Sequence, residues 1–453
     1  MSTIGEVRGT GRATTGVRFV HTADWQIGMT RRYLPAEAQG RFTAARTEVV
    51  RRIGALAAEQ QADFVLVAGD VFEHSQLTPQ TVRRALEALR EVPVPVYLLP
   101  GNHDHLGPMS IWSSPVLRDE LPEHVHVLDS VGVHAMALGE DREGEPSAAG
   151  RRVELVAAPW AGKHPTQDPV AAALGSLPPG PAPEGTVRIL VGHGAVDVLD
   201  PDGHVKAPIQ VRALREALDE GRIHYAALGD RHSRTQVGGD PAIWFSGAPE
   251  PTDWREQAPG DALVVRISPL ADSGAGAGAF AGAGRQAQVE VEPHSVARWR
   301  YVALDERVDS DADLDALDRR LTALPDKECT IVRLGLSGTL GLAQHARLEE
   351  ILERHLDLLA ALHRPAQHSD VVLVADDDLS ELELRGFLAG AVDVLRSESV
   401  TDDAETGADD TGTGADDAGM LSDEPFQPGR PDDDESARDA LALLYRLTRG
   451  GAR

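Results

Sequence analysis

Short apolar runs alternate with helical patterns over the first 255 residues of this chain. The apolar runs predict buried strands at 17–22, 64–68, 94–99, 153–157, 187–191, 225–228 and 243–246. Longer amphipathic stretches predict helices at 36–60 and 78–91, with Thr78 as the N-cap of the second and Pro79 in its first turn. Strands that alternate with helices predict an α/β domain of stacked layers.

A second alternation follows in residues 256–396 and predicts a smaller α+β domain. Its expected strands are 262–268, 286–292, 302–304, 330–336 and 370–375, and its expected helices are 311–324, 342–362 and 379–395. The first two strands are joined by a Gly- and Ala-rich loop, 271–284. Residues 397–435 have the composition of a disordered acidic linker. Residues 436–449 form an amphipathic pattern, either a helix that docks a partner or one that packs back onto its own chain.

The net charge of −28 argues at first against a nucleic-acid partner. Between Glu398 and Glu435, however, 14 acidic residues face one basic residue, a net of −13, which leaves −28 − (−13) = −15 for the rest. Arginines along one groove, with metal ions, could still neutralise the phosphates of DNA.

The chain has one cysteine, which excludes a disulfide framework and a cysteine-rich metal site. It has neither an apolar run of membrane-spanning length nor a signal-peptide pattern, so we expect a soluble, cytoplasmic protein without a membrane partner.

Polar clusters follow five of the predicted strands. In chain order they are Asp24-Trp25-Gln26, Gly69-Asp70, Gly101-Asn102-His103-Asp104, Gly192-His193 and Gly229-Asp230-Arg231-His232. In sheets covered by helices, ligand sites gather at the carboxyl ends of the strands. Carboxylate and amide oxygens and imidazole nitrogens all bind divalent metals, so the clusters predict a two-metal phosphoesterase centre.

The residue types indicate a role for each candidate. Asp70 follows a glycine at a strand end and is the natural bridging ligand, while Asp24 and Gln26 can share one metal. Asn102 offers a carbonyl oxygen to the other metal. His193, Asp230 and His232 complete the ligand set. We expect His103 to meet the phosphate as an acid or electrostatic stabiliser, with Asp104 orienting it.

The ordered motifs D-x-Q, GD, GNHD, GH and GDxH resemble those of the calcineurin-like metallophosphoesterases. The runs 21–28, 68–72, 99–104 and 245–250 narrow the resemblance, over residues 17–255, to SbcD-type DNA repair exonucleases. This resemblance implies a layered α/β/β/α metallophosphoesterase sandwich (17–255), a capping domain (256–396), the linker (397–435) and a terminal docking helix (436–449).

The resemblance also implies the chemistry. One metal would be held by Asp24, Gln26, Asp70 and His232, and the other by Asp70, Asn102, His193 and Asp230. Mn²⁺ would be the working metal, with Mg²⁺ as the alternative, and His103 would stabilise the transition state. The implied partners are DNA and an SbcC-like coiled-coil ATPase, with a second copy of the chain as a further candidate.

Two positions depart from the family pattern, which has D-x-H and G-H-x-H. Gln26 replaces an imidazole with a weaker neutral oxygen, whereas Asp230 replaces one with a hard anion that favours Mn²⁺ or Mg²⁺. Both can still ligate, which predicts an altered centre rather than a dead one. We hypothesise that Gln26→His strengthens metal binding, and calorimetry that gives equal or weaker Mn²⁺ affinity would contradict this.

Two other functions stay open: a phosphodiesterase or phosphatase acting on small nucleotides, and a structural subunit that holds the ATPase without cleaving. Trp25 and Trp160 either pack in the core or rim or stack on a base. His21 is expected to pack beside the ligands, and Arg231 and Arg234 are equally open as phosphate contacts or as surface residues. His74 and His105 lie beside motifs and are open as substrate contacts or as solvated loop residues. Five other histidines are expected at the surface: His204, His224, His345, His355 and His363.

Overall fold

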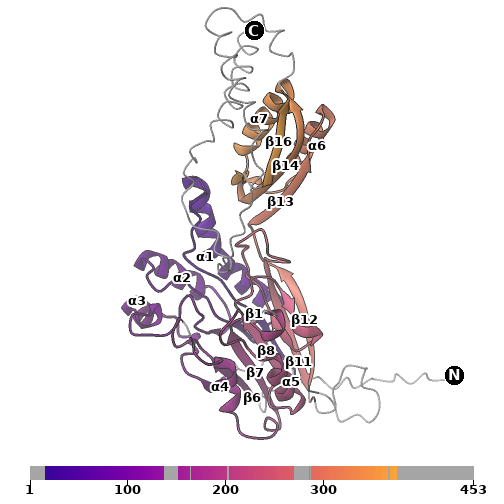
Figure 1. Cartoon of the computed structure of the whole chain (residues 1–453). Helices are drawn as coiled ribbons and strands as arrows, with labels where there is room; N and C mark the ends of the chain where they lie inside the picture. Colours follow the sequence, from indigo (N-terminus) through magenta and orange to yellow (C-terminus); the bar gives the residue numbers. More distant parts are fainter. Residues whose placement is uncertain are drawn as a thin grey trace, which may run out of the picture. The chain divides into compact units, whose positions relative to one another are not determined.

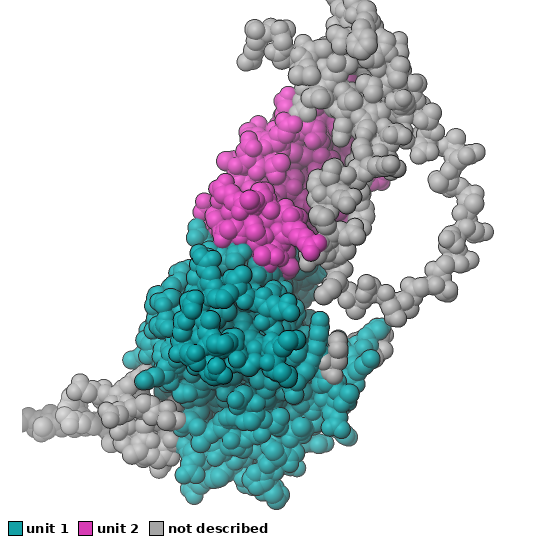
Figure 2. Space-filling view, turned by 90° about the vertical axis from the view of Figure 1, so that its left-hand side faces the viewer, with its two compact units in different colours: residues 1–29, 43–298 teal, residues 30–42, 299–453 magenta. Residues whose placement is uncertain are grey.

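The computed structural model describes residues 16–136, 152–163, 165–200, 204–269, 285, 287–365 and 368–374. The chain forms two compact units, coloured separately in Figure 2: unit 1 is Met1–Met29 with Thr43–Arg298, and unit 2 is Thr30–Phe42 with Trp299–Arg453. Several sequence predictions lie outside the described residues, namely the loop 271–284, the helix 379–395, the acidic linker 397–435 and the terminal helix 436–449.

The first sheet of unit 1 has six strands in the order β12-β11-β1-β2-β3-β4. Their bounds are β1 Val17–Thr22, β2 Phe64–Val67, β3 Val96–Leu98, β4 Val125–Val127, β11 Asp261–Pro269 and β12 Ala287–Ser295. Strands β1 to β4 are parallel, and β11 pairs antiparallel with β1. The predicted boundary at residue 255 is therefore wrong, because β11 and β12 complete the sheet of the first domain.

The second sheet also has six strands, in the order β5-β6-β7-β8-β10-β9. Their bounds are β5 Gly132–Met136, β6 Arg152–Ala158, β7 Thr186–His193, β8 Tyr225–Gly229, β9 Thr235–Gln236 and β10 Ile243–Phe245. The four strands β6, β7, β8 and β10 are parallel, with antiparallel β5 and β9 at the edges. The parallel strands of each sheet bring their carboxyl ends to one edge.

Alternate side chains of β1, β2 and β3 enter two different cores, as the period of two in a strand requires. Phe19 and Phe64 pack with residues of the second sheet such as Ile189. Their neighbours Val20 and Val65 pack with helices. The second sheet and its own helices share the first core, so unit 1 is an α/β/β/α sandwich (Figure 1), which confirms the predicted fold class.

The helices of unit 1 are α1 Ala36–Glu59, α2 Pro79–Arg90, α3 Pro115–Glu120, α4 Pro169–Gly175 and α5 Val211–Asp219, and α1 begins in unit 2. Helix α2 starts as predicted, because the Thr78 hydroxyl accepts a hydrogen bond from Thr81 N at 3.2 Å and Pro79 needs no N–H partner. The buried stripe of α2 includes Val82, Leu86 and Leu89.

Among the described residues, unit 2 contains a four-stranded sheet and two complete helices besides the start of α1, and its buried apolar residues form a cluster of their own. Its elements are β13 Arg300–Arg307, α6 Asp311–Thr322, β14 Thr330–Gly341, α7 Leu342–Leu356, β15 Ala361–His363 and β16 Ser369–Val374. The prediction that α7 continues to residue 362 is wrong, because residues 361–363 pair with β14 instead. Among the described residues, no helix is long and apolar enough to cross a membrane.

Candidate metal centre

The candidate ligands lie where strands β1, β2, β3, β7 and β8 end. His193 is the last residue of β7, and the other candidates lie in the loops that follow the remaining four strands. Backbone hydrogen bonds tie two of these loops together: Asp24 N donates to Gly69 O and Gln26 N donates to Asp70 O, each at 3.0 Å. Because β1, β2 and β3 belong to the first sheet and β7 and β8 to the second, both sheets contribute candidate ligands.

Backbone strain is concentrated at these candidates. Four of them have a positive φ, a conformation that residues other than glycine rarely adopt: Asp24 (54°), Gln26 (46°), Asp70 (53°) and Asp230 (101°). Among the described residues, only three other non-glycine positions share it. Such strain costs about 1–3 kcal/mol per residue and clusters at functional sites.

Two glycines let the backbone approach the ligands closely. Gly69 has a φ of +96°, and a Cβ added there would lie 2.1 Å from His193 Nδ1. A Cβ at Gly101 would lie 2.1 Å from Asp70 Oδ1. Because real Cβ atoms do not approach this closely, any side chain at either position would displace a ligand.

His193 presents Nε2 to a group of hydrogen-bond acceptors. Its Nδ1 lies 2.8 Å from the Ala68 carbonyl, which can only accept, so Nδ1 carries a proton. Its Nε2 lies 2.8 Å from Asn102 Oδ1, 3.4 Å from Asp70 Oδ1 and 3.7 Å from Asp230 Oδ1. Turning the Asn102 amide over would let its nitrogen donate to Asp70 and His193. Without a metal this orientation, with the amide nitrogen toward Asp70 and His193, satisfies the hydrogen bonds, and a cation bound between these groups would instead take the amide oxygen.

His232 is held in the same manner. Its Nδ1 lies 3.1 Å from Glu256 Oε1 and 2.8 Å from the hydroxyl of Thr252, which itself donates to Glu256. A carboxylate behind one ring nitrogen is the usual support of a metal-binding histidine, since it leaves the other nitrogen for the ion. That nitrogen, Nε2, lies 3.0 Å from Gln26 Nε2.

The buried acidic and basic side chains of the site shift one another's pKa values. Burial raises the pKa of Asp24 to about 7. Burial lowers the pKa of His232, but the hydrogen bond that its ring donates to Glu256 and the charge of Asp24 outweigh burial and raise that pKa to about 9. For His193 the charge of Asp70 outweighs burial and raises the pKa well above its usual value. Divalent cations would replace these protons, as metal ions do when they bind imidazole and carboxylate ligands.

The donor set therefore fits a metal ion. One ligand atom each from Asp24, Asp70 and His193 lies within 4.8 Å of the others, and all three side chains are buried. The remaining candidates, Asn102, Asp230, Gln26 and His232, lie beside this cluster through the contacts above. The arrangement can hold divalent cations between oxygen and nitrogen ligands.

The structure gives Asp104 a different role from the predicted one of orienting His103. His103 Nδ1 donates to the Glu73 carbonyl at 2.8 Å, so this carbonyl, and not Asp104, orients the imidazole. Asp104 is fully buried and accepts hydrogen bonds from Gly101 N at 2.7 Å and Phe72 N at 3.1 Å. Asp104 thus holds the two loops that carry Asp70 and Asn102.

Other residues near the site pack rather than face it. Trp25 is buried and its Nε1 donates to Thr22 Oγ1, while Trp160 Nε1 donates to His193 O. His21 is fully buried beside Tyr225, as expected for a packed residue. Arg234 forms an ion pair with Asp261.

Arg231, which the sequence left open as a phosphate contact, donates Nε to Thr235 Oγ1 at 2.9 Å. Two residues outside the predicted set, Glu256 and Thr252, support His232. Glu256 and Thr252 were missed, because they lie in an irregular loop without a motif of its own. Three histidines expected at the surface are buried instead, namely His224, His345 and His355, whereas His204 is exposed.

Residues 17–234 match the family model described as calcineurin-like phosphoesterase. The matched residues carry all of the candidate ligands and make up slightly less than half of the chain. This similarity and the donor set agree, since calcineurin-like phosphoesterases use divalent metals.

Curated relatives match parts of this domain. The chain is 32% identical over 124 residues to the metallophosphoesterase YhaO of Bacillus subtilis, 35% over 91 residues to the DNA double-strand break repair protein Mre11 of Archaeoglobus fulgidus, and 34% over 125 residues to the SbcD subunit of nuclease SbcCD of Rhodobacter capsulatus. These matches cover 26%, 19% and 26% of this chain, and 28%, 19% and 26% of the relatives. The chain thus aligns with at most 28% of the length of each of these three relatives.

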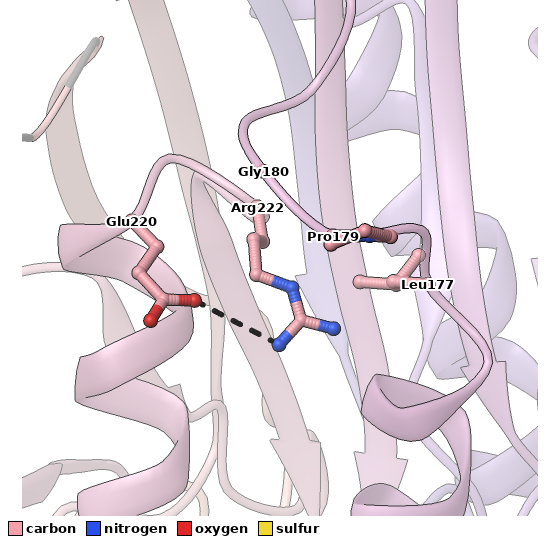
Figure 3. Close-up of a pocket in the computed structure, with 5 residues that line it drawn as sticks. All are labelled: Leu177, Pro179, Gly180, Glu220 and Arg222. Atoms are coloured by element: carbon pink, nitrogen blue, oxygen red, sulfur yellow. Dashed lines mark ion pairs between the residues drawn. The ribbon is translucent and has the colours of Figure 1, made fainter.

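A shallow pocket elsewhere on unit 1 does not belong to this centre (Figure 3). It is lined by Leu177, Pro179, Gly180, Glu220 and Arg222. These residues precede β7 and β8, so the pocket lies at the amino ends of strands whose carboxyl ends carry the ligands. The Arg222 guanidinium is held by Glu220 at 3.8 Å and by Leu174 O at 2.6 Å, which indicates a structural role.

Proposed function

We propose that this protein is a metal-dependent DNA nuclease that hydrolyses phosphodiester bonds, exonucleolytically on duplex ends. The observation that carries the proposal is the buried group of Asp24, Asp70 and His193, in which Nε2 of the imidazole faces only acceptors. The similarity to Mre11 and to the SbcD subunit of nuclease SbcCD supports DNA as the substrate.

The ligands divide into two sets that share Asp70. In the first set, Gln26 and His232 are in contact beside Asp24. In the second set, the side chains of Asn102 and Asp230 lie beside Nε2 of His193. We assign one divalent ion, Mn²⁺ or alternatively Mg²⁺, to each set. When bound, such a pair neutralises the phosphate and lowers the pKa of the attacking water.

The side chains of the protein would orient the substrate and move a proton. His103 has Nδ1 fixed on the Glu73 carbonyl, so Nε2 is the nitrogen that would donate to the phosphate. Hydrolysis forms a bond from water oxygen to phosphorus and breaks the bond to the leaving sugar oxygen, which takes a proton. His103 is suited to stabilise the charge that develops or to supply this proton.

The proposed partners are DNA and an SbcC-like coiled-coil ATPase, with the terminal segment 436–449 as the docking element and a second copy of the chain as a further candidate. The cytoplasm is the expected location. The net charge of −28 favours the second candidate function, a phosphodiesterase acting on small nucleotides, since a small substrate does not require a long basic surface. A structural subunit that holds the ATPase is the third.

The experiment compares substrates and variants in one assay. Full-length protein is incubated with end-labelled duplex DNA, single-stranded DNA or bis(p-nitrophenyl) phosphate in Mn²⁺, with and without a chelator. Asp70→Asn and His103→Ala are the test variants, and His204→Ala, at an exposed histidine, is the control. We expect duplex degradation that is lost with the chelator and in both test variants and kept in the control.

Each other outcome selects a different function. Hydrolysis of the small diester with intact DNA would favour the small-nucleotide phosphodiesterase. No hydrolysis of any substrate, even after the ATPase is added, would contradict the nuclease and leave the structural subunit, whose partner binding would survive Asp70→Ala.

A further inference from the structure

Helix α1 carries a fully buried arginine, Arg46, whose side chain contacts two loops of the metal centre. Its Nη2 donates to the Pro251 carbonyl at 2.8 Å, and its Nη1 lies 3.5 Å from the Trp25 carbonyl, at the long limit of a hydrogen bond. These three residues all belong to unit 1. The planar guanidinium presents several donors in a fixed fork, so one arginine can hold two carbonyl groups at once.

The Trp25 carbonyl lies in the loop that carries the first ligands. Trp25 stands between Asp24 and Gln26 in the chain, and both of these neighbours have a strained positive φ. A strained backbone persists only where the surrounding structure holds it. Hydrogen bonds to the loop after β2 hold the N–H groups of Asp24 and Gln26, and Arg46 approaches the carbonyl that lies between them.

The Pro251 carbonyl lies at the start of the segment that supports His232. The next residue, Thr252, places its hydroxyl 2.8 Å from His232 Nδ1 and donates its N–H to Glu256 Oε2 at 2.9 Å. Glu256 Oε1 lies 3.1 Å from the same ring nitrogen. A hydrogen bond from Arg46 to Pro251 O therefore fixes the residue that precedes this support.

Burying a cation is costly, and an apolar side chain of similar volume often stabilises a protein as well or better. The contacts of Arg46 therefore point to a role in the geometry of the centre. His193, in contrast, is held by the Ala68 carbonyl, which belongs to a different loop from the two that Arg46 contacts.

We propose that Arg46 is a positioning residue for one of the two ions. It holds the loop of Asp24 and the segment that orients His232 in register, so that both ligands meet the same ion. The ion beside His193 does not depend on it. This inference rests on the proposed two-ion centre, and it assigns a role in that centre to a residue outside the ligand loops.

The test measures Mn²⁺ binding by calorimetry in the full-length protein without substrate. Arg46→Met keeps an unbranched side chain but removes both donors. We expect the Mn²⁺ at Asp24 and His232 to bind about 10–100-fold more weakly, the range seen when partners that orient metal ligands are removed. Arg51→Met is the matched control on the same helix, because Arg51 pairs with Glu48 and Glu91, and it should bind Mn²⁺ as wild type does.

Anomalous diffraction from crystals of the full-length protein shows which ion is affected. At a Mn²⁺ concentration that fills both positions in the wild type, Arg46→Met should lose the peak beside His232 and keep the peak beside His193. Loss of both peaks together would mean that the substitution loosens the whole centre, and it would overturn the proposal. Unchanged peaks and affinities would overturn it as well.

Two further results separate positioning from charge. Tighter Mn²⁺ binding in Arg46→Met would mean that the buried cation merely repels the ion, which would overturn the proposal. Arg46→Lys keeps the charge and one nitrogen donor, so its affinity should lie between those of the wild type and Arg46→Met; a lysine no better than methionine would contradict a role for the donors.

Failure of this inference and failure of the proposed function are distinguishable. Wild-type protein that binds no Mn²⁺ at any concentration would overturn both. Wild-type protein that binds two ions, with Arg46→Met indistinguishable from it, would overturn the role of Arg46 alone and leave the proposed nuclease intact.

Discussion

Gly69→Ala tests whether close backbone packing holds His193 in place. Gly180→Ala is its matched control, because both glycines have positive φ, +96° and +85°, but a Cβ at Gly180 meets nothing within 4 Å. Each substitution forces an alanine into the left-handed region, at a cost of about 1–2 kcal/mol. Only the Gly69 substitution also places a Cβ 2.1 Å from His193 Nδ1 and 2.9 Å from its Cβ.

The additional cost at Gly69 follows from the hydrogen bond that His193 loses. Its Nδ1 donates to Ala68 O at 2.8 Å in a fully buried position, and a displaced ring leaves this donor or acceptor unsatisfied, at about 1–3 kcal/mol. We therefore expect Gly69→Ala to reduce the free energy of unfolding by about 1–3 kcal/mol more than Gly180→Ala. It should also abolish Mn²⁺ binding at His193.

Urea unfolding in chelator, followed by tryptophan fluorescence, provides the measurement. Of the six tryptophans, only Trp299 belongs to unit 2, so the signal reports mainly on unit 1. Equal destabilisation by the two substitutions, with Mn²⁺ binding retained in Gly69→Ala, would refute the argument that backbone contact fixes His193.

Three further predictions follow from buried polar groups. Asp104→Ala leaves the N–H groups of Gly101 and Phe72 without their acceptor and should cost about 2–5 kcal/mol of unfolding free energy, with Asp104→Asn milder; equal stability of all three proteins in urea would contradict this. In Glu256→Gln the side chain keeps one acceptor oxygen and cannot accept from both His232 Nδ1 and Thr252 N. We therefore expect calorimetry to show that the Mn²⁺ at His232 binds about 10–100-fold more weakly. The control Glu123→Gln, at an exposed glutamate, should bind Mn²⁺ as wild type does. Burial lowers the pKa of His21 from its ordinary value of 6.5 to about 3 in the folded protein. The stability that the neutral imidazole contributes is therefore complete above pH 6.5 and falls by about 1.4 kcal/mol per pH unit between pH 6.5 and pH 3. Unfolding free energies of wild type and His21→Gln should converge over that range, and a pH-independent difference would be inconsistent with a buried neutral imidazole.

The strands and the ligand loops could be predicted from the sequence because their signals are local. An apolar run that ends in a glycine and a carboxylate, such as Phe64 to Asp70, specifies both a buried strand and the residue placed at its carboxyl end. Thr78 and Pro79 likewise specify the start of α2. These features depend on neighbouring residues in the chain and not on distant partners.

Features that depend on distant partners were not predictable. Residues 361–363 continue a helical pattern, but pairing with β14 decides their structure. Strands β11 and β12 follow the last motif in sequence, yet they complete the sheet that begins with β1. Glu256 supports His232 from 24 residues further along the chain. Nothing in its own segment distinguishes it from a surface carboxylate.

The orientation of side chains within the centre was also beyond the sequence. Gln26 and Asn102 carry the same functional group, and the motifs assign both to metal binding. Only the structure shows that Gln26 lies against His232 and Asn102 against His193. The departure from the family pattern at Gln26 was evident, but its consequence for His232 required the structure.

Anomalous diffraction from crystals of the full-length protein equilibrated with Mn²⁺ tests the account most directly, because it locates the ions without reference to activity. At excess Mn²⁺ the account predicts one peak within bonding distance of His193 Nε2 and Asp70 and a second peak beside His232. Excess Mn²⁺ that leaves both positions empty, with Asp24, Asp70 and His193 bonded only to each other, would contradict the metal centre and the nuclease proposed from it.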